Sequence, residues 1–304
     1  MGSRGAGACI GLTVALAFAA CTSSAPVRAE NPDRITVASF DFAESELLAA
    51  LYGGALEHRG FDVDLELRVG PREFVDPALA RGLVDVVPEY AGTAVQFLRA
   101  SEAVDANDAA VTHRALVEAA DRIGVTALAA AAAQDANAIV VSRATAERHD
   151  LATVSDLVPV AGQLVFGGPP ECPQRPLCLQ GLEATYDIHV GEFVALDVGG
   201  PVTLQALRTG DIDVGVLFTT DPALDDGDLV ELRDDRGLQP AENITPLVVD
   251  DAIERHGPRL ADALDAVSQR LTTPQLRELN QRVARQPERL RRIANDWLES
   301  EGLS

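Results

Sequence analysis

Short apolar runs that alternate with longer amphipathic segments are the feature that most restricts the fold of this chain. Ile35–Ala38 is short and apolar, and Val63–Val69 alternates as a half-buried strand does. Between them, Glu44–Arg59 places several leucines on one side of a helix. The same alternation continues to the C-terminus, although the short helix expected next begins only at Pro77. This order of elements predicts an α/β protein.

A block from about Ile139 to Pro240 has the pattern of a complete, smaller α/β unit placed inside a larger one. Such an insertion gives two lobes that are joined by two crossings of the chain. Two α/β lobes joined in this way place a ligand cleft between them.

The first twenty residues have the composition of a cleaved signal peptide. Arg4 precedes the apolar run Ile10–Ala20, which is too short for a permanent membrane span of about 20 apolar residues. Residues 1–20 are therefore expected to be removed when the protein is exported.

The segment Phe18-Ala19-Ala20-Cys21 resembles a bacterial lipobox, in which the cysteine is acylated and becomes the new N-terminus. We therefore expect an extracytoplasmic protein that is held to the cell membrane by lipid on Cys21. Residues 21–33 are small, polar and Pro-containing, as expected of a flexible tether. Ordinary secretion with cleavage after Ala29 is the alternative.

The cysteines are consistent with export. Cys9 lies in the segment expected to be removed, while Cys172 and Cys178 flank a Pro-rich loop. Two cysteines this close in an oxidising compartment predict a local disulfide. A zinc site would need further ligands, and none of the five histidines lies near these cysteines in sequence, so no metal is expected.

Charge and motifs exclude several classes of function. The formal net charge of −22 repels a phosphate backbone, so nucleic acid is not an expected partner. The chain has no Gly-x-Ser-x-Gly elbow and no phosphate-binding Gly-x-x-x-x-Gly-Lys loop, and Gly167–Pro170 lacks the lysine that phosphate binding needs. We therefore expect neither an enzyme nor a cofactor.

Five segments, in order, carry a resemblance to a known family. The most specific is Gly82–Thr93, which contains Pro-Glu-Tyr-Ala-Gly-Thr and is similar to the family signature GxIDxxPEYTGT. The others are Ser39–Ser45, Leu164–Cys172, Leu207–Pro222 and Asp234–Pro240. Together they resemble the solute-binding proteins of osmoprotectant ABC importers, which take up glycine betaine, choline and carnitine.

The resemblance implies a type II periplasmic-binding-protein fold with hinge crossings near Asn137 and near residues 240–243. Residues 34–137 and 242–304 would form the first lobe, and residues 138–241 the second. The chain would be the extracytoplasmic solute-binding subunit of an importer, a monomer whose partners are a permease and an ATPase. Ligand would shift an equilibrium between open and closed lobes toward the closed state.

The resemblance also implies a ligand site, from which this sequence departs in part. Aromatic faces attract a trimethylammonium group with about 0.5–2 kcal/mol per ring, and relatives supply several tyrosines for this purpose. Tyr90 and Thr93 match ligand-binding positions. Where relatives often carry aromatic residues, this chain has alanines at 129–133 and Ala-Glu-Asn at 241–243. With three tyrosines in the whole chain, a complete tyrosine cage is excluded.

The candidate site therefore combines a few aromatic rings with carboxylates, hydroxyls and amides. Its residues are Ser39, Phe40, Asp41, Glu44, Glu73, Tyr90, Thr93, Asp135, Asn137, Phe218, Thr219, Thr220 and Asn243. Some of these have a structural alternative, since Phe218 can be a core residue and Asp41 or Glu44 can cap the following helix. Two ligand classes remain open, a quaternary amine and a polar solute such as a polyol or sugar. An exported sensor is the alternative to an importer subunit.

Overall fold

The computed structural model describes residues 1–2, 33–99 and 108–304. Cys21, and with it most of the expected leader and tether, lies outside the described residues. Within the described part of the chain, no helix is both long and apolar enough to cross a membrane.

Strands and helices alternate through the chain. The strands are β1 Ile35–Phe40, β2 Val63–Gly70, β3 Val86–Tyr90, β4 Val125–Ala127, β5 Asn137–Ser142, β6 Val165–Gly168, β7 Glu192–Ala195, β8 Val214–Phe218, β9 Leu229–Glu231 and β10 Ile244–Val249. The α-helices are α1 Ala43–His58, α2 Arg72–Ala80, α3 Ala91–Arg99, α4 Ala109–Asp121, α5 Arg143–His149, α6 Leu179–Tyr186, α7 Pro201–Thr209, α8 Asp250–His256, α9 Pro258–Ser268, α10 Thr273–Arg285 and α11 Leu290–Ser300. Short 3₁₀ helices are η1 Val154–Leu157, η2 Ala161–Gln163, η3 Cys172–Gln174, η4 Pro222–Asp226 and η5 Pro287–Arg289.

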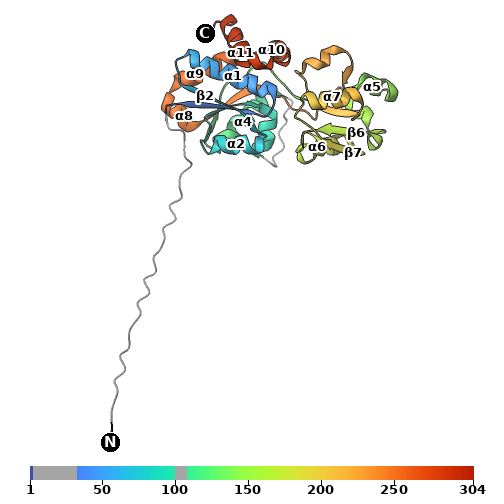
Figure 1. The fold of residues 1–304 in the computed structure, drawn as a ribbon, viewed down its shortest axis with the longest axis horizontal. Coiled ribbons are helices and arrows are strands. Elements are labelled where there is room, and N and C mark those ends of the chain that lie inside the picture. The colour runs from blue at the N-terminus through green and yellow to red at the C-terminus, as the bar shows by residue number, and fades with distance from the viewer. Residues whose placement is uncertain (3–32, 100–107) are drawn as a thin grey trace.

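Two five-stranded sheets divide these elements into two lobes (Figure 1). The first sheet has the order β2-β1-β3-β10-β4, and the second has the order β7-β6-β8-β5-β9. In each sheet one strand that follows a crossing runs antiparallel to its neighbours: β10 in the first and β5 in the second. The chain therefore passes between lobes twice, after β4 and before β10. The predicted α/β, two-lobed fold with two hinge crossings is confirmed.

The two crossing segments are hydrogen bonded to each other. The N–H of Ala131 donates to the carbonyl of Ile244 at 2.8 Å, and the N–H of Ile244 donates to the carbonyl of Ala133 at 3.0 Å. One step closer to the cleft, the N–H of Asp135 donates to the carbonyl of Glu242 at 3.1 Å. Ala131 and Ala133 are buried, so these two positions of the alanine run pack within the contact between the crossings.

The core of the first lobe forms around α1. Its leucines are fully buried because the sheet covers one side of the helix while α9, α10 and α11 cover the other (Figure 1). Trp297 and Leu298 of α11 are buried there. Gly54 permits the contact, since a Cβ at this position would lie 2.8 Å from Cδ1 of Leu298.

One local prediction is wrong. The helix expected to begin at Pro77 begins at Arg72, so that Pro77 lies inside α2. Gly167 and Gly168 form the second half of β6. A Cβ at Gly167 would lie 2.5 Å from Cδ1 of Ile212, so glycine is needed there for close packing rather than for a turn.

The α1–α11 contact predicts a large loss of stability for Leu298→Ala. This fully buried side chain fills the space above Gly54, so its removal leaves a cavity that costs about 2–5 kcal/mol of unfolding free energy. Urea unfolding of the wild type and the variant measures the difference. Val202→Ala, at a position that is 54% exposed, is the control and changes the unfolding free energy little. An equal effect of both substitutions contradicts this account of the core.

Candidate functional site

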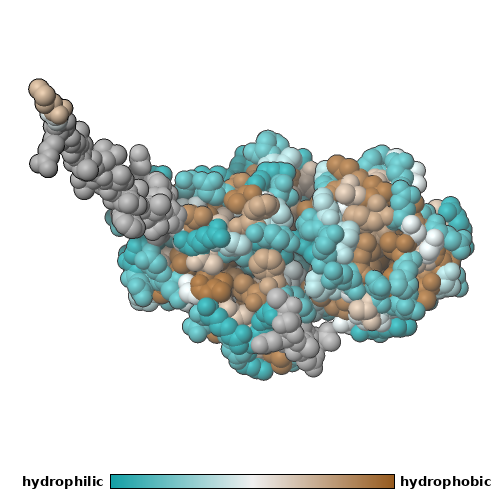
Figure 2. All heavy atoms as spheres, turned by 90° about the horizontal axis from the view of Figure 1, so that it is seen from below, coloured by the Kyte–Doolittle hydropathy of each residue, from teal (hydrophilic) through white to brown (hydrophobic). Residues whose placement is uncertain are grey.

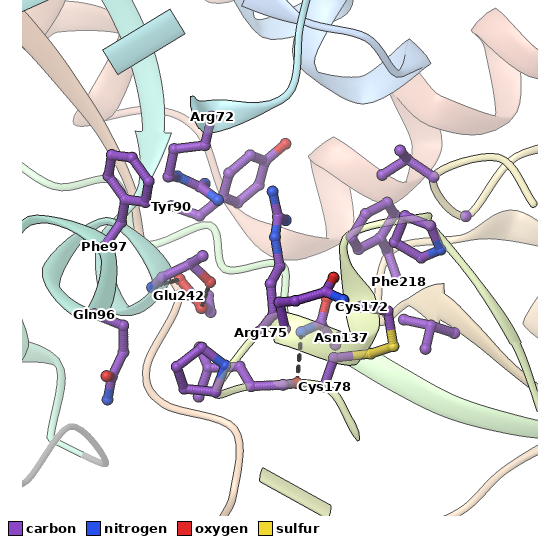
Figure 3. A pocket seen from close by; sticks show the side chains of 18 of the residues that line it. Arg72, Tyr90, Gln96, Phe97, Asn137, Cys172, Arg175, Cys178, Phe218 and Glu242 are labelled. Atoms are coloured by element: carbon purple, nitrogen blue, oxygen red, sulfur yellow. Dashed lines mark hydrogen bonds between the residues drawn. A yellow bond between two sulfur atoms is a disulfide. The ribbon is translucent and has the colours of Figure 1, made fainter. Parts of the chain in front are cut away.

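A cavity of about 490 Å³ lies between the two lobes (Figure 3). Its volume is within the range of small-molecule sites. The first lobe and the crossings contribute aromatic, acidic and basic side chains, whereas the second lobe contributes the disulfide loop and the end of β8. The residues that line it include Phe42, Arg72, Glu73, Tyr90, Thr93, Gln96, Phe97, Asp135, Asn137, Arg175, Phe218 and Glu242.

Three aromatic rings form a continuous surface across the cleft. Phe42 lies at the start of α1, Tyr90 at the end of β3 and Phe218 at the end of β8 in the other lobe. The ring centroid of Phe42 is 5.9 Å from that of Tyr90 and 5.1 Å from that of Phe218. Phe40, predicted as a wall, is buried behind Phe42 with its centroid at 6.2 Å and does not line the cavity.

The signature segment Pro-Glu-Tyr-Ala-Gly-Thr contacts the second crossing. A Cβ on Gly92 would lie 2.3 Å from Cγ of Pro240 and 3.0 Å from the carbonyl oxygen of Ala241, so only glycine admits the crossing here. Thr93 donates both its N–H, at 3.0 Å, and its hydroxyl to the carboxylate of Glu242. The motif therefore contacts the second crossing and also lines the cavity.

Glu44 connects Tyr90 to the second lobe. Its Oε1 accepts the phenol of Tyr90 at 2.9 Å, and its Oε2 accepts the hydroxyl of Thr220 and the amide of Asn280, each at 2.5 Å. Burial raises the pKa of the Tyr90 phenol well above its ordinary value. Glu44 is buried and does not line the cavity. It fixes the position of the Tyr90 ring instead.

Asp135, on the first crossing, lines the cavity and has one carboxyl oxygen without a hydrogen-bond donor in the described part of the chain. Its Oδ1 accepts the hydroxyl of Thr219 and the N–H of Thr220, each at 3.0 Å. Its Oδ2 is buried and has no hydrogen-bond partner among the described residues. Burial, with Glu44 close by, raises the pKa of Asp135 well above its ordinary value. Thr219 and Thr220 therefore hold this carboxyl and do not line the cavity themselves.

Glu242 on the second crossing is the other acidic wall. It is 2% exposed, and burial raises its pKa to about 7. Nearby, Arg72 donates from Nε and Nη2 to the two oxygens of Glu89 at 2.7 and 2.8 Å. Glu89 is fully buried, so the charge of Arg72 is already matched within the protein.

The disulfide loop carries a third charged group into the cleft. Cys172 and Cys178 are joined by the disulfide that the sequence predicts. Arg175, between them, extends from this loop toward Tyr90 (Figure 3) and binds Glu73 of the opposite lobe through Nη2 at 3.0 Å. Asn137 donates from Nδ2 to the carbonyl of Leu177 at 3.2 Å and so supports the loop.

Of the predicted site residues, Glu73, Tyr90, Thr93, Asp135, Asn137 and Phe218 line the cavity. Ser39, Asp41 and Asn243 do not. The hydroxyl of Ser39 accepts the N–H of Arg68 at 2.9 Å, and Asp41 forms a surface ion pair with the same arginine at 2.8 Å. Asn243 donates to the carbonyl of Ala131 at 2.8 Å within the hinge.

Arg72, Arg175 and Glu242 are cavity residues that were not predicted. Arg72 and Arg175 lie outside any ligand-binding motif, and each reaches the cavity only through the folding of its loop or helix. Glu242 could have been predicted from the sequence. A charged residue among apolar neighbours beside a crossing has to face either a polar partner or the cleft.

Two lobes, two hydrogen-bonded crossings and an enclosed cavity between them define a solute-binding protein of the periplasmic type. The chain belongs to the family described as the substrate binding domain of ABC-type glycine betaine transport systems, whose sequence profile matches residues 33–300. Proteins of this family are binding subunits of importers and not enzymes.

Curated relatives match along most of their length. The chain is 25% identical to a glycine-betaine-binding protein of Pseudomonas aeruginosa over 93% of this chain and 93% of that protein. It is 26% identical to the glycine betaine-binding protein YehZ of Escherichia coli over 92% and 93%. A carnitine transport binding protein, OpuCC of Listeria monocytogenes, is 23% identical over 88% and 87%.

Solved structures share the fold. One described as a glycine betaine/carnitine/choline ABC transporter superposes with a TM-score of 0.69 at 20% identity, covering 88% of this chain and 99% of that one. A choline binding protein in complex with choline superposes with a TM-score of 0.66 at 13% identity, covering 89% of each chain. Identities this low establish the fold alone.

The buried carboxyl of Glu242 predicts an unusual pH dependence of stability. Its pKa is raised from 4.5 to about 7 in the folded protein, so the folded state retains a proton that the unfolded state has lost. Its contribution to the unfolding free energy is therefore lost as pH rises through this interval. Glu242→Gln should weaken the decline, whereas the exposed Glu288→Gln should not. Urea unfolding of the ligand-free proteins at about pH 5 and about pH 7.5 measures this, and identical profiles contradict it.

Proposed function

We propose that this chain binds a small solute with a quaternary ammonium head, of the glycine betaine, choline or carnitine kind, in the cavity between its lobes. It delivers this solute to the permease and ATPase of an ABC importer. The names of its curated relatives and the chemistry of its cavity both support this assignment.

The observation that carries the proposal is an excess of buried carboxyl groups at the cavity. Asp135 and Glu242 form its walls, and Glu44 and Glu89 lie directly behind them. Among the described residues, the buried cation beside this group is Arg72, which Glu89 already matches. Burial raises the pKa of both walls, and a cation beside them stabilises their ionised form, so the site favours a ligand that brings a positive charge.

The aromatic surface suits the same ligand. A quaternary ammonium group has no N–H to donate, and the faces of Phe42, Tyr90 and Phe218 attract it through their quadrupoles. Three rings attract the cation less strongly than a complete aromatic cage would. The carboxyl groups of Asp135 and Glu242 add electrostatic attraction in place of further rings. A polyol would leave this charge unmatched.

Arg175 would bind a carboxylate at the other end of a zwitterionic ligand. Its ion pairs with Glu73 and Glu171 both use Nη2, which leaves the rest of the guanidinium directed into the cavity. A bidentate carboxylate is the usual partner of such a group.

The location of the protein is part of the proposal. We infer that Cys21 is acylated and anchors a monomeric binding protein outside the cell membrane. The lipobox-like segment supports this, and the local disulfide is of the kind found in oxidising compartments. The hydrophilic surface that surrounds scattered apolar patches is typical of such a protein (Figure 2). Labelling of the expressed protein with a radioactive fatty acid, lost in Cys21→Ser, tests the anchor.

Calorimetry with choline, glycine betaine, carnitine and sorbitol tests the ligand class. We expect binding of at least one quaternary amine and none of sorbitol. Tyr90→Ala should lose about 0.5–2 kcal/mol of binding free energy, the contribution of one ring, whereas Tyr90→Phe keeps the ring and loses less. Heat from sorbitol alone, or full affinity in Tyr90→Ala, contradicts the proposal.

Arg175→Gln separates the two ends of the ligand. Because choline has no carboxylate, the variant should weaken glycine betaine and carnitine by roughly tenfold or more, the effect of losing a charge-assisted hydrogen bond, and choline much less. The same calorimetric titrations give the ratio of affinities. A uniform loss for all three ligands means that Arg175 acts only by supporting the closed lobes.

A further inference from the structure

The geometry around Asp135 points to a proton that the ligand displaces. We propose that Asp135 and Glu44 share one proton in the ligand-free protein, and that an entering ammonium head replaces it and releases it to solvent. This inference rests on the proposed function, because it requires a cationic ligand.

The two carboxyl groups are held together by a common partner. Thr220 donates its N–H to Oδ1 of Asp135 at 3.0 Å and its hydroxyl to Oε2 of Glu44 at 2.5 Å. Both groups are buried, at 3% and 6% exposure. Two buried carboxylates this close repel each other, and one retained proton relieves the repulsion.

The carboxyl oxygens of Glu44 and Asp135 differ in the hydrogen bonds that they accept. Both oxygens of Glu44 accept hydrogen bonds, from Tyr90, Thr220 and Asn280. In contrast, Oδ2 of Asp135 is buried without a partner, and this residue lines the cavity. An oxygen in this position is satisfied if it carries the proton, or if a cation arrives in front of it.

The surrounding elements offer little positive charge to hold both groups ionised. Tyr90 of β3 and Asn280 of α10 are neutral donors, and Glu242 of the second crossing and Asp221 before η4 are acidic. Arg277 of α10 donates to the carbonyl of Thr219 at 2.9 Å, and Arg72 is engaged by Glu89. Arg175, which lines the same cavity, is paired with Glu73 and Glu171. The raised pKa of Asp135 agrees with this arrangement.

The exchange balances in charge. Two carboxyl groups that share one proton carry a net charge of −1. Uptake of one cation and release of the proton leave the net charge at the site unchanged at −1. Below the pKa of the pair, the affinity for a permanent cation should therefore fall about tenfold for each pH unit, the change that one linked proton produces.

Calorimetry of choline binding tests this. Titrations at one pH in two buffers with different ionisation enthalpies give the number of protons released, which we expect to be about one at about pH 6. The neutral isostere 3,3-dimethyl-1-butanol has the shape of choline without its charge, and it should bind without proton release. Between about pH 5 and about pH 8, the choline affinity should rise while that of the isostere stays level.

Variants assign the proton. Asp135→Asn and Glu44→Gln each remove one member of the pair and should abolish proton release, with folding checked by circular dichroism. Either variant alone suffices if the other fails to fold. Glu231→Gln is the control, because this carboxyl belongs to β9 of the second lobe and does not line the cavity, so release should persist.

The outcomes are distinct. Choline binding without proton release over the whole pH range overturns the inference and leaves the proposed function intact. Loss of release in Glu242→Gln with normal release in Asp135→Asn also overturns it, because the proton then belongs to the other acidic wall. Failure of every quaternary amine to bind overturns the proposed function and this inference with it.

Discussion

The contact between the signature segment and the second crossing is the constraint on which the rest of the site depends. Gly92 admits Pro240 at a distance that no other residue permits, and Thr93 then binds Glu242 through two hydrogen bonds. The first crossing is hydrogen bonded to the second, which places Asp135 beside the same cavity. Asp135 and Glu242 both lie on the crossing segments. A rotation of one lobe against the other is therefore expected to move both carboxyl groups, which couples ligand binding to the geometry of the hinge.

This arrangement explains how a solute can close the lobes. In the structure the second lobe is linked to the first through Thr220 and Glu44 and through Arg175 and Glu73. These contacts favour closure, whereas the buried carboxyl groups disfavour it, since closure removes them further from water. In the proposed function a cation removes this opposing contribution and also contacts rings of both lobes, Phe42 and Tyr90 of the first and Phe218 of the second. Closure then follows as a shift between two states that are close in free energy.

The sequence predicted the architecture better than the site, and the reason is physical. Strand and helix periodicity is local, so the two α/β units could be read directly from residues near each other in the chain. Tyr90 and Thr93 could be predicted because one short motif carries them both. In contrast, Arg72 and Arg175 reach the cavity from elements far apart in sequence. The alanine run at 129–133 stands where relatives often carry aromatic residues, and in the structure Ala131 and Ala133 are buried where the crossings are hydrogen bonded to each other.

The remaining question of selectivity turns on Arg175. Its guanidinium is not a free anion site, because Glu73 and Glu171 already lie at 3.0 and 3.2 Å from Nη2. A ligand carboxylate therefore competes with two acidic side chains that are partly exposed to water and cost little to displace. A ligand without a carboxylate leaves these pairs, and the interlobe contact with Glu73, in place. In the proposed function, cations and zwitterions therefore differ in their contacts with Arg175. Both bring a positively charged group to Asp135, Glu242 and the three rings.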